Sequence, residues 1–243
     1  MTTEFNPVAI IPHYNHSDTL PSVVEQLLAM GLPVIVVDDG SNLQNVEKIQ
    51  PLAERENVQV LFQPYNGGKG VAMKVGLQFA SFQGFSHALQ IDADGQHRLS
   101  DALIMLEKAQ QNPNALICGA PVYGEDAPKA RLYGRKITDF WNMINTHSKD
   151  LKDGMCGFRI YPLVEVSPIL QQEYTGNRMD FDIEILVKCH WQKIPMIWVD
   201  TPVKYEQGGI SHFRGLADNW LISKMHARLF FGMLIRSITG KSV

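Results

Sequence analysis

The sequence of residues 8–41 is VAIIPHYNHSDTLPSVVEQLLAMGLPVIVVDDGS, and its pattern indicates the class of the fold. Val8 to Pro12 and Val34 to Val37 are short apolar runs followed by polar residues, as in buried parallel strands. Between them, Ser17 or Asp18 can cap a helix with apolar residues on one side, namely Val23, Val24, Leu27 and Leu28. The stretch therefore predicts a β-α-β unit.

The same alternation continues along the chain. Further strands are predicted at residues 58–62, 87–91, 115–119 and 197–205. Further helices are predicted at residues 46–54, from the glycine loop at 67–70 to residue 79, at 101–110, 137–144 and 182–191, and from 215 onward. Strands that alternate with helices predict an α/β fold with a mostly parallel sheet covered by helices on both faces. We expect one such Rossmann-like domain over residues 1–214, followed by a helical tail over residues 215–243.

Composition and charge indicate a globular protein and argue against some classes of partner. A chain of 243 residues with 45% apolar residues can bury a full core, and its net charge of −3 excludes the overall basic field by which proteins collect nucleic acid. The three cysteines form no CxxC pair, so we expect reduced thiols in a cytoplasmic protein. The first residues do not resemble a signal peptide and no apolar run approaches the roughly 20 residues that span a bilayer, so we expect peripheral membrane contact at most.

Polar clusters follow three of the predicted strands, at residues 12–15, 38–41 and 92–97. In α/β sheets the ligand site lies beyond the carboxyl ends of the strands, where such loops converge. Asp92-Ala93-Asp94 places two carboxylates at one strand end, and together with Gln96 they offer the oxygen ligands that Mg²⁺ or Mn²⁺ prefers. The alternative for this DxD motif is a loop that uses aspartate for a turn and a helix cap.

Two further motifs fit a nucleotide. Asp38-Asp39-Gly40-Ser41 could accept hydrogen bonds from a base or ribose, or could be a plain Asx turn. Asn66-Gly67-Gly68-Lys69-Gly70 offers backbone donors and one cation at a helix N-terminus, which is a usable anion site. It lacks the P-loop spacing, and a flexible loop is the alternative.

These motifs, in this order, resemble family 2 glycosyltransferases with the GT-A fold, in particular the dolichyl- or polyprenyl-phosphate sugar synthases. The resemblance covers about residues 6–215, and Asp153 to Tyr161 resembles the segment DPTSGFRAY of that branch. It implies that the nucleotide-sugar site includes Pro12, Tyr14, Asn15, Asp39, Gly68, Lys69 and Asp92, and that the metal ligands are Asp92, Asp94 and Gln96. Departures at His16, Gly154, Met155 and Cys156 concern the acceptor more than the donor.

The resemblance also implies candidates for the transfer step. Arg135 and Arg159 match positions that face the acceptor phosphate, and His212 matches a late loop that could touch the diphosphate. Asp182 could serve as general base for a hydroxyl acceptor, whereas a phosphate acceptor needs little proton removal. Each has a plainer alternative: the arginines as solvated charges, His212 as a structural residue, and Asp182, with Asp180 and Glu184, as an acid favoured at a helix N-terminus.

The segment from residue 214 to the end has five basic residues and one acid, interleaved with aromatic residues. A basic, apolar helix suits a membrane surface, and it equally suits packing on the domain or on a second copy in a homodimer. With a lipid-linked acceptor, we expect the protein at the inner face of the membrane.

The motifs together predict a metal-dependent transferase that moves a sugar from a nucleoside-diphosphate donor, with uridine as the expected base, by an inverting displacement. The alternatives are a nucleotidyltransferase, which would release pyrophosphate, and a catalytically silent scaffold that docks a membrane partner through the tail.

Overall fold

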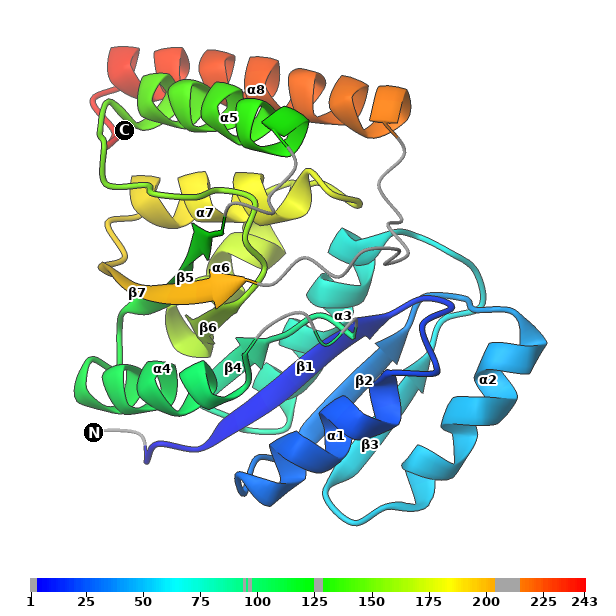
Figure 1. The fold of residues 1–243 in the computed structure, drawn as a ribbon. Coiled ribbons are helices and arrows are strands. Elements are labelled where there is room, and N and C mark those ends of the chain that lie inside the picture. Colours follow the sequence, from blue (N-terminus) through cyan, green and yellow to red (C-terminus); the bar gives the residue numbers. More distant parts are fainter. Residues whose placement is uncertain (1–3, 94, 96–97, 125–128, 204–214) are drawn as a thin grey trace.

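The computed structural model describes residues 4–93, 95, 98–124, 129–203 and 215–243, and its centre is a seven-stranded sheet (Figure 1). The strands are β1 (Pro7–His13), β2 (Val34–Asp38), β3 (Val58–Phe62), β4 (His87–Gln90), β5 (Leu116–Tyr123), β6 (Arg159–Pro162) and β7 (Met196–Val203). Their order is β3-β2-β1-β4-β6-β5-β7, and only β6 runs antiparallel to its neighbours. The predicted mostly parallel sheet is confirmed.

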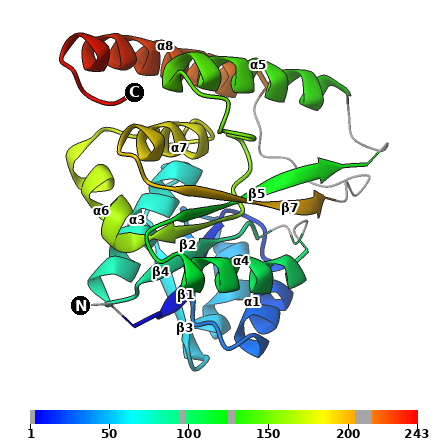
Figure 2. The same ribbon diagram turned by 90° about the vertical axis from the view of Figure 1, so that its left-hand side faces the viewer.

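Helices cover both faces of this sheet, as predicted. They are α1 (Leu20–Ala29), α2 (Leu43–Ile49), the 3-10 helix η1 (Gln50–Glu54), α3 (Lys69–Phe82), α4 (Ser100–Gln111), α5 (Lys129–Thr146), α6 (Leu163–Gln172), α7 (Phe181–Trp191) and α8 (Gly215–Ile238). Successive side chains of a strand point to opposite faces. Accordingly Val8 and Ile10 join the core under α3, α6, α7 and α8, while Ala9 and Ile11 join the core under α1, η1 and α4 (Figure 2).

Two helical regions depart from the predictions. Helix α6 is not predicted from the sequence, and it contains Pro168, a residue type that usually breaks a helix interior. The predicted helix at 46–54 is α2 followed by η1, because Asn42 caps α2 early and Pro51 begins a tighter turn. The Asn42 side chain accepts a hydrogen bond from the Asn45 amide at 3.0 Å.

The C-terminal segment forms α8, which packs against the domain. One side of α8 is buried, through Asp218, Ile222, Met225, His226, Leu229 and Met233. The buried carboxylate of Glu184 on α7 binds Arg228 through two hydrogen bonds of 3.0 and 2.6 Å. Of the alternatives for this segment, packing on the domain is therefore observed for one side of the helix.

Helices α5 and α8 lie side by side as the outermost layer (Figures 1 and 2). The Trp141 ring stacks on His226 with centroids 6.0 Å apart and meets Phe230 edge to face at 6.5 Å. Within the described part of the chain, no helix is long and apolar enough to cross a bilayer.

Close packing of α3 on the sheet depends on Gly76. A Cβ atom at this position would lie 2.6 Å from Cγ2 of Ile10. We expect Gly76→Val to destabilise the fold by about 1–3 kcal/mol, because inserted methyl groups strain a packed core. Urea unfolding followed by circular dichroism measures this. Gly134→Val is the matched control: the site is open in α5, and a change of roughly 0.5 kcal/mol or less is expected.

Candidate active site at the carboxyl edge of the sheet

The loops after β1 and β2 are locked together by a buried pair. His13 and Asp38 are paired in the strand register, and Nδ1 of His13 lies 2.7 Å from Oδ1 of Asp38. The His16 amide donates to Nε2 of His13, so the histidine proton lies on Nδ1 and is donated to Asp38. Burial raises the pKa of Asp38, but the hydrogen bonds from His13 and Ser41 outweigh burial, and the pKa lies below its ordinary value.

Predicted nucleotide residues lie at this edge. Pro12 and Tyr14 are half-buried at the end of β1. Asn15 has a left-handed φ of 53°, its amide donates to the Ser41 hydroxyl at 2.9 Å, and its side-chain oxygen accepts from the Asn42 amide at 3.0 Å. Asn15 thus ties the two loops together, while Pro12 and Tyr14 border them.

Asp39 organises the glycine loop. Its two carboxylate oxygens accept from the amides of Gly67 at 2.9 Å and Gly68 at 2.7 Å. Gly40 is needed beside it, because its φ is +70° and a Cβ atom would lie 2.4 Å from the Tyr65 carbonyl carbon. Burial raises the pKa of Asp39, and the two amide hydrogen bonds offset only part of this effect.

This arrangement corrects one prediction. The glycine loop is predicted as an anion site or as a flexible loop, and in the structure the amides of Gly67 and Gly68 bind the Asp39 carboxylate. A carboxylate from β2 satisfies the same donors that an external anion would use. Gly68 and Asp39 therefore bind each other and fix the conformation of the glycine loop.

Lys69, at the start of α3, joins three elements. Its Nζ atom lies 2.7 Å from Oδ1 of Asp92, just after β4, and 3.1 Å from Oδ2 of Asp182 on α7. Burial alone would lower the pKa of Lys69, but the two carboxylates outweigh it and raise the pKa above its ordinary value. Lys69 therefore stays charged and fixes the Asp92 carboxylate at the edge of the sheet.

Asp182 is engaged on both oxygens. Besides Lys69, it accepts a 2.9 Å hydrogen bond from Nε2 of Gln90, whose own oxygen accepts from the Tyr161 hydroxyl at 2.8 Å. The side chain is buried. In this structure Asp182 thus positions Lys69 and Gln90, which differs from the predicted general base facing an acceptor.

Arg159 also differs from its prediction. The residue is fully buried, and its guanidinium donates to the backbone oxygens of Asp182 at 2.5 Å and Gly154 at 2.9 Å. A side chain in this position holds the start of α7 against β6. The arginine predicted to meet an acceptor phosphate is here a positioning residue.

Arg135 lies nearer the surface. Its guanidinium contacts Oδ2 of Asp153 at 2.5 Å and lies over the Tyr123 ring at 5.1 Å. Asp153 is fixed in turn by the amides of Met155 at 2.7 Å and Cys156 at 2.9 Å. This cluster joins the end of β5 to α5, and it leaves part of the arginine exposed.

The remaining predicted residues, Asp94, Gln96 and His212, lie outside the described residues. The chain just before Asp94 is anchored, because the Thr19 hydroxyl donates to the Ala93 oxygen at 2.6 Å. Among the described side chains, no group of three or more His, Cys, Asp or Glu residues could hold a metal ion.

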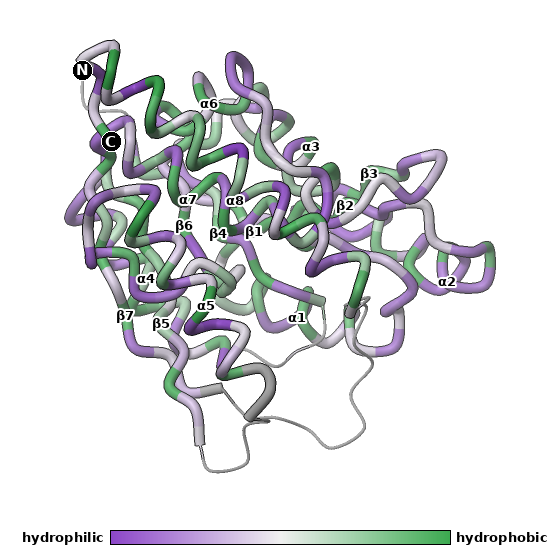
Figure 3. Tube along the Cα trace, turned by 90° about the horizontal axis from the view of Figure 1, so that it is seen from above, coloured by the Kyte–Doolittle hydropathy of each residue, from purple (hydrophilic) through white to green (hydrophobic). Residues whose placement is uncertain are grey.

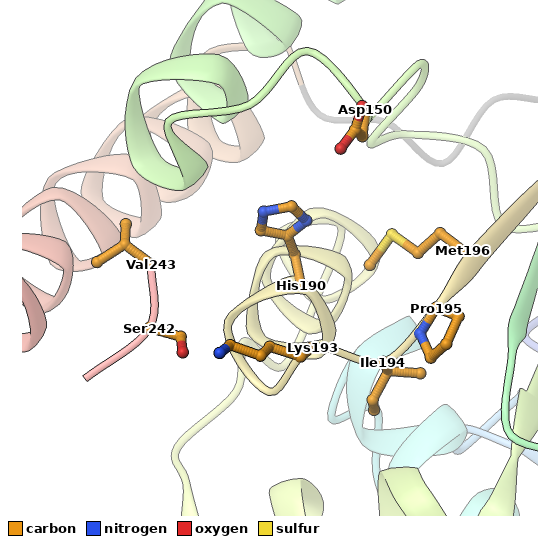
Figure 4. Close-up of a pocket in the computed structure, with 8 residues that line it drawn as sticks. All are labelled: Asp150, His190, Lys193, Ile194, Pro195, Met196, Ser242 and Val243. Atoms are coloured by element: carbon orange, nitrogen blue, oxygen red, sulfur yellow. The ribbon is translucent and has the colours of Figure 1, made fainter.

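A surface pocket of about 340 Å³ lies at the opposite edge of the sheet (Figure 4). It is lined by Asp150, His190, Lys193, Ile194, Pro195, Met196, Ser242 and Val243. Met196 begins β7, so the pocket is beside the amino end of that strand. It shares no residue with the predicted site.

Known protein families were compared with the chain, including the loops that follow β1, β2 and β4. The family model described as Glycosyl transferase family 2 matches residues 8–162, more than half of the chain. The chain belongs to glycosyl transferase family 2.

Relatives of this family 2 glycosyltransferase agree with the branch indicated by its motifs. A dolichyl-phosphate beta-glucosyltransferase of Trichomonas vaginalis is 27% identical, over 96% of this chain and 76% of the relative. A polyprenol monophosphomannose synthase of Mycolicibacterium smegmatis is 31% identical, over 63% of this chain and 60% of the relative. Glucosyl-3-phosphoglycerate synthase from Mycobacterium tuberculosis has the same fold, with a TM-score of 0.70 and 13% identity over 95% of this chain and 80% of that one. The predicted GT-A fold is thereby confirmed.

Some site residues of this glycosyltransferase were not predicted. Gln90 lies within an apolar strand pattern, Tyr161 ends the segment that resembles DPTSGFRAY, and their hydrogen bond joins residues far apart in the chain. Arg178 lies across the glycine loop, where its NH1 donates to Oδ1 of Asn66 at 3.2 Å and a Cβ atom on Gly68 would lie 2.4 Å from its Cγ. His13 and Tyr161 lie within segments that the sequence analysis singles out, whereas Gln90 and Arg178 have no local signal.

The Asp39 contact can be tested by one amide substitution. We expect Asp39→Asn to lower the free energy of unfolding by about 1–3 kcal/mol, because one of its two acceptors becomes a donor facing a glycine amide. Asp18→Asn is the control, since that carboxylate is exposed and pairs with Lys48 on the surface. Equal unfolding midpoints for the two variants in urea would contradict the role given to Asp39.

We expect the stability of the folded protein to depend on pH through Asp139. Burial, followed by the nearby charge of Asp153, raises the pKa of Asp139 to about 7. A raised carboxyl pKa means that the folded state holds this proton between about pH 4 and 7 while the unfolded chain has lost it, so stability falls as pH rises through this range. We expect Asp139→Asn to flatten that fall in unfolding measured from pH 4 to 8. Asp150→Asn, at an exposed position, should retain the wild-type slope.

Proposed function

We propose that this glycosyltransferase moves a sugar from a uridine-diphosphate sugar to the phosphate of a polyprenyl lipid, with inversion at the anomeric carbon. The observation that carries the proposal is the Asp92 carboxylate, held by Lys69 just after β4, the strand next to β1 in the sheet. A donor diphosphate at this edge would lie beside the DxD motif, with the nucleoside over Pro12, Tyr14 and the loop closed by Asn15 and Asp39.

The chemistry of the donor set fits a divalent cation. Asp92 presents a partly exposed carboxylate, and Asp94 and Gln96 add further oxygen ligands within the same short loop. Hard cations such as Mg²⁺ and Mn²⁺ favour such ligands. When bound, the cation would neutralise charge on the departing diphosphate. The structural relative from Mycobacterium tuberculosis was solved with Mn²⁺, uridine diphosphate and glucosyl-3-phosphoglycerate, which supports this choice of metal and base.

A phosphate acceptor suits the residues around the site. One acceptor phosphate oxygen forms the new bond to the anomeric carbon as the bond from that carbon to the diphosphate oxygen breaks, and uridine diphosphate leaves. An ionised phosphate needs no base, whereas a hydroxyl does. Asp182, the predicted base, already holds Lys69 and Gln90. The names of the relatives, which specify dolichyl phosphate and polyprenol monophosphomannose, support the same acceptor class.

Arg135 is proposed to bind the acceptor phosphate. Asp153 and Tyr123 hold the guanidinium at the end of β5, and part of the side chain is exposed. A guanidinium presents a planar set of donors whose geometry matches the oxygens of a phosphate. Lys69 and His212 are proposed to add positive charge near the diphosphate.

Transfer assays test the whole proposal. We expect release of uridine diphosphate from a uridine-diphosphate sugar only with Mn²⁺ or Mg²⁺ and polyprenyl phosphate, and not with the dephosphorylated polyprenol. Asp94→Asn should reduce turnover at least 100-fold, since loss of charge stabilisation at a departing group costs about 3 kcal/mol or more. Asp150→Asn is the control and should keep wild-type turnover.

Donor binding is measured separately by thermal unfolding. A ligand at 100 times its dissociation constant stabilises a protein by about 2.7 kcal/mol. We expect uridine diphosphate with Mn²⁺ to raise the unfolding temperature more than the guanosine, cytidine or adenosine diphosphates, and Asp94→Asn to abolish the metal-dependent part. Transfer that persists at the wild-type rate in a chelator would overturn the metal assignment.

A further inference from the structure

The outermost layer of the protein exposes large apolar side chains on two neighbouring helices. On α8 these are Leu216, Trp220, Phe231, Leu234, Ile235 and Ile238, and on α5 they are Tyr133, Ile137 and Phe140. We call these nine residues the outer apolar face. Trp220 and Phe231 are each 63% exposed and Leu216 is 93% exposed, although such side chains are usually buried when a protein offers them a core. Exposed apolar side chains gathered on one side of a protein are typical of an interaction site.

Helix geometry directs this face away from the domain. At 100° per residue, the exposed apolar residues of α8 lie on the side opposite its buried stripe of Ile222, Met225, Leu229 and Met233, in one group near each end of the helix. On α5, Tyr133, Ile137 and Phe140 likewise lie opposite the buried Thr138 and Asn142. Figure 3 views the molecule from this side, and along both helices hydrophobic and hydrophilic positions alternate.

On α5 and α8 the described lysines are exposed, whereas the carboxylates are turned toward the protein. Lys136 and Lys224 are exposed, and Lys224 lies over the Trp220 ring at 5.1 Å. The acids point inward: Asp218 is 2% exposed, and Asp139 lies close to Asp153 and Arg135. Among the described exposed side chains of α5 and α8 there are lysine and arginine but no carboxylate. The protein as a whole has a net charge of −3, so this separation makes the layer locally cationic.

The layer also begins at the edge that holds the candidate active site. Helices α5 and α8 follow the carboxyl ends of β5 and β7, respectively, and Arg135 lies within the first half of α5. Tyr133 and Ile137 are therefore within one turn of the arginine proposed to bind the acceptor phosphate.

We propose that the outer apolar face of α5 and α8 is a docking surface for an anionic lipid bilayer. Trp220, Phe231 and their neighbours enter the boundary between headgroups and acyl chains, and Lys136 and Lys224 contact the lipid phosphates. A bilayer matches both features at once, because it offers apolar volume beneath a layer of negative charge. The inference deepens the proposed lipid-linked acceptor, since docking would bring Arg135 to the depth of a lipid phosphate, but its test needs neither donor nor metal.

Vesicle flotation tests this surface with the full chain. The probes are vesicles of phosphatidylcholine alone and of phosphatidylcholine with phosphatidylglycerol, at low and high salt. We expect binding to the anionic vesicles, weakened by high salt. The double variant Trp220→Gln with Phe231→Gln should lower the partition coefficient at least tenfold, because two large apolar side chains no longer enter the bilayer. Lys224→Gln should weaken binding to anionic vesicles and leave binding to neutral ones unchanged.

The matched control is Leu43→Gln with Phe82→Gln. These side chains are 73% and 86% exposed and lie on α2 and α3, away from the outer layer. The control should bind vesicles like the wild type, and urea unfolding should show both double variants folded. An equal loss in the control, or no binding of the wild type to anionic vesicles, would overturn the proposal. A concentration-dependent dimer abolished by the Trp220 and Phe231 changes would also overturn it, by assigning the face to a second copy.

Activity in detergent separates this inference from the proposed function. With polyprenyl phosphate dissolved in detergent, the Trp220 and Phe231 variant should retain wild-type turnover while failing to bind vesicles. Loss of vesicle binding with retained turnover supports docking independently of chemistry. If the wild type binds vesicles but transfers no sugar, the docking surface stands and the proposed reaction fails.

Discussion

The site depends on a charge cluster enclosed between α3, β4 and α7. Lys69 contacts Asp92 at 2.7 Å and Asp182 at 3.1 Å, and Asp182 is held further by Gln90. Removing charges from water is costly, and removing one member of such a cluster leaves an uncompensated charge that costs about 3–5 kcal/mol. The cluster therefore fixes the relative positions of three elements that are distant in sequence.

Several of the predicted ligand residues bind other parts of the protein. Asp39 binds the glycine loop, Asp182 binds Lys69 and Gln90, and Arg159 binds backbone oxygens. Groups that are already oriented by such bonds need little reorganisation when a ligand arrives, which is how preorganised sites stabilise developing charge. Asn15, Asp92 and Arg135 are among the predicted residues that are both anchored and partly exposed.

The outer layer of α5 and α8 is attached to the domain by contacts on one side of each helix. Glu184 and Arg228 attach α8 to α7, and Trp141 meets His226 and Phe230 between α5 and α8. These contacts use one side of each helix and leave the other side apolar and cationic. One side of each helix thus stabilises the fold, and the opposite side is exposed.

The α/β class, the β1-α1-β2 unit and the polar loops at strand ends follow from the chain itself, because periodicity and strand-end polarity are local properties. Whether a polar residue in those loops faces a ligand or the protein is not local. Asp39 finds Gly67 and Gly68, and Asp182 finds Lys69, only when distant strands and helices meet, so each carboxylate takes the nearest donors the fold supplies. The antiparallel β6 and the pairing of α5 with α8 likewise depend on long-range packing, which no periodic pattern encodes.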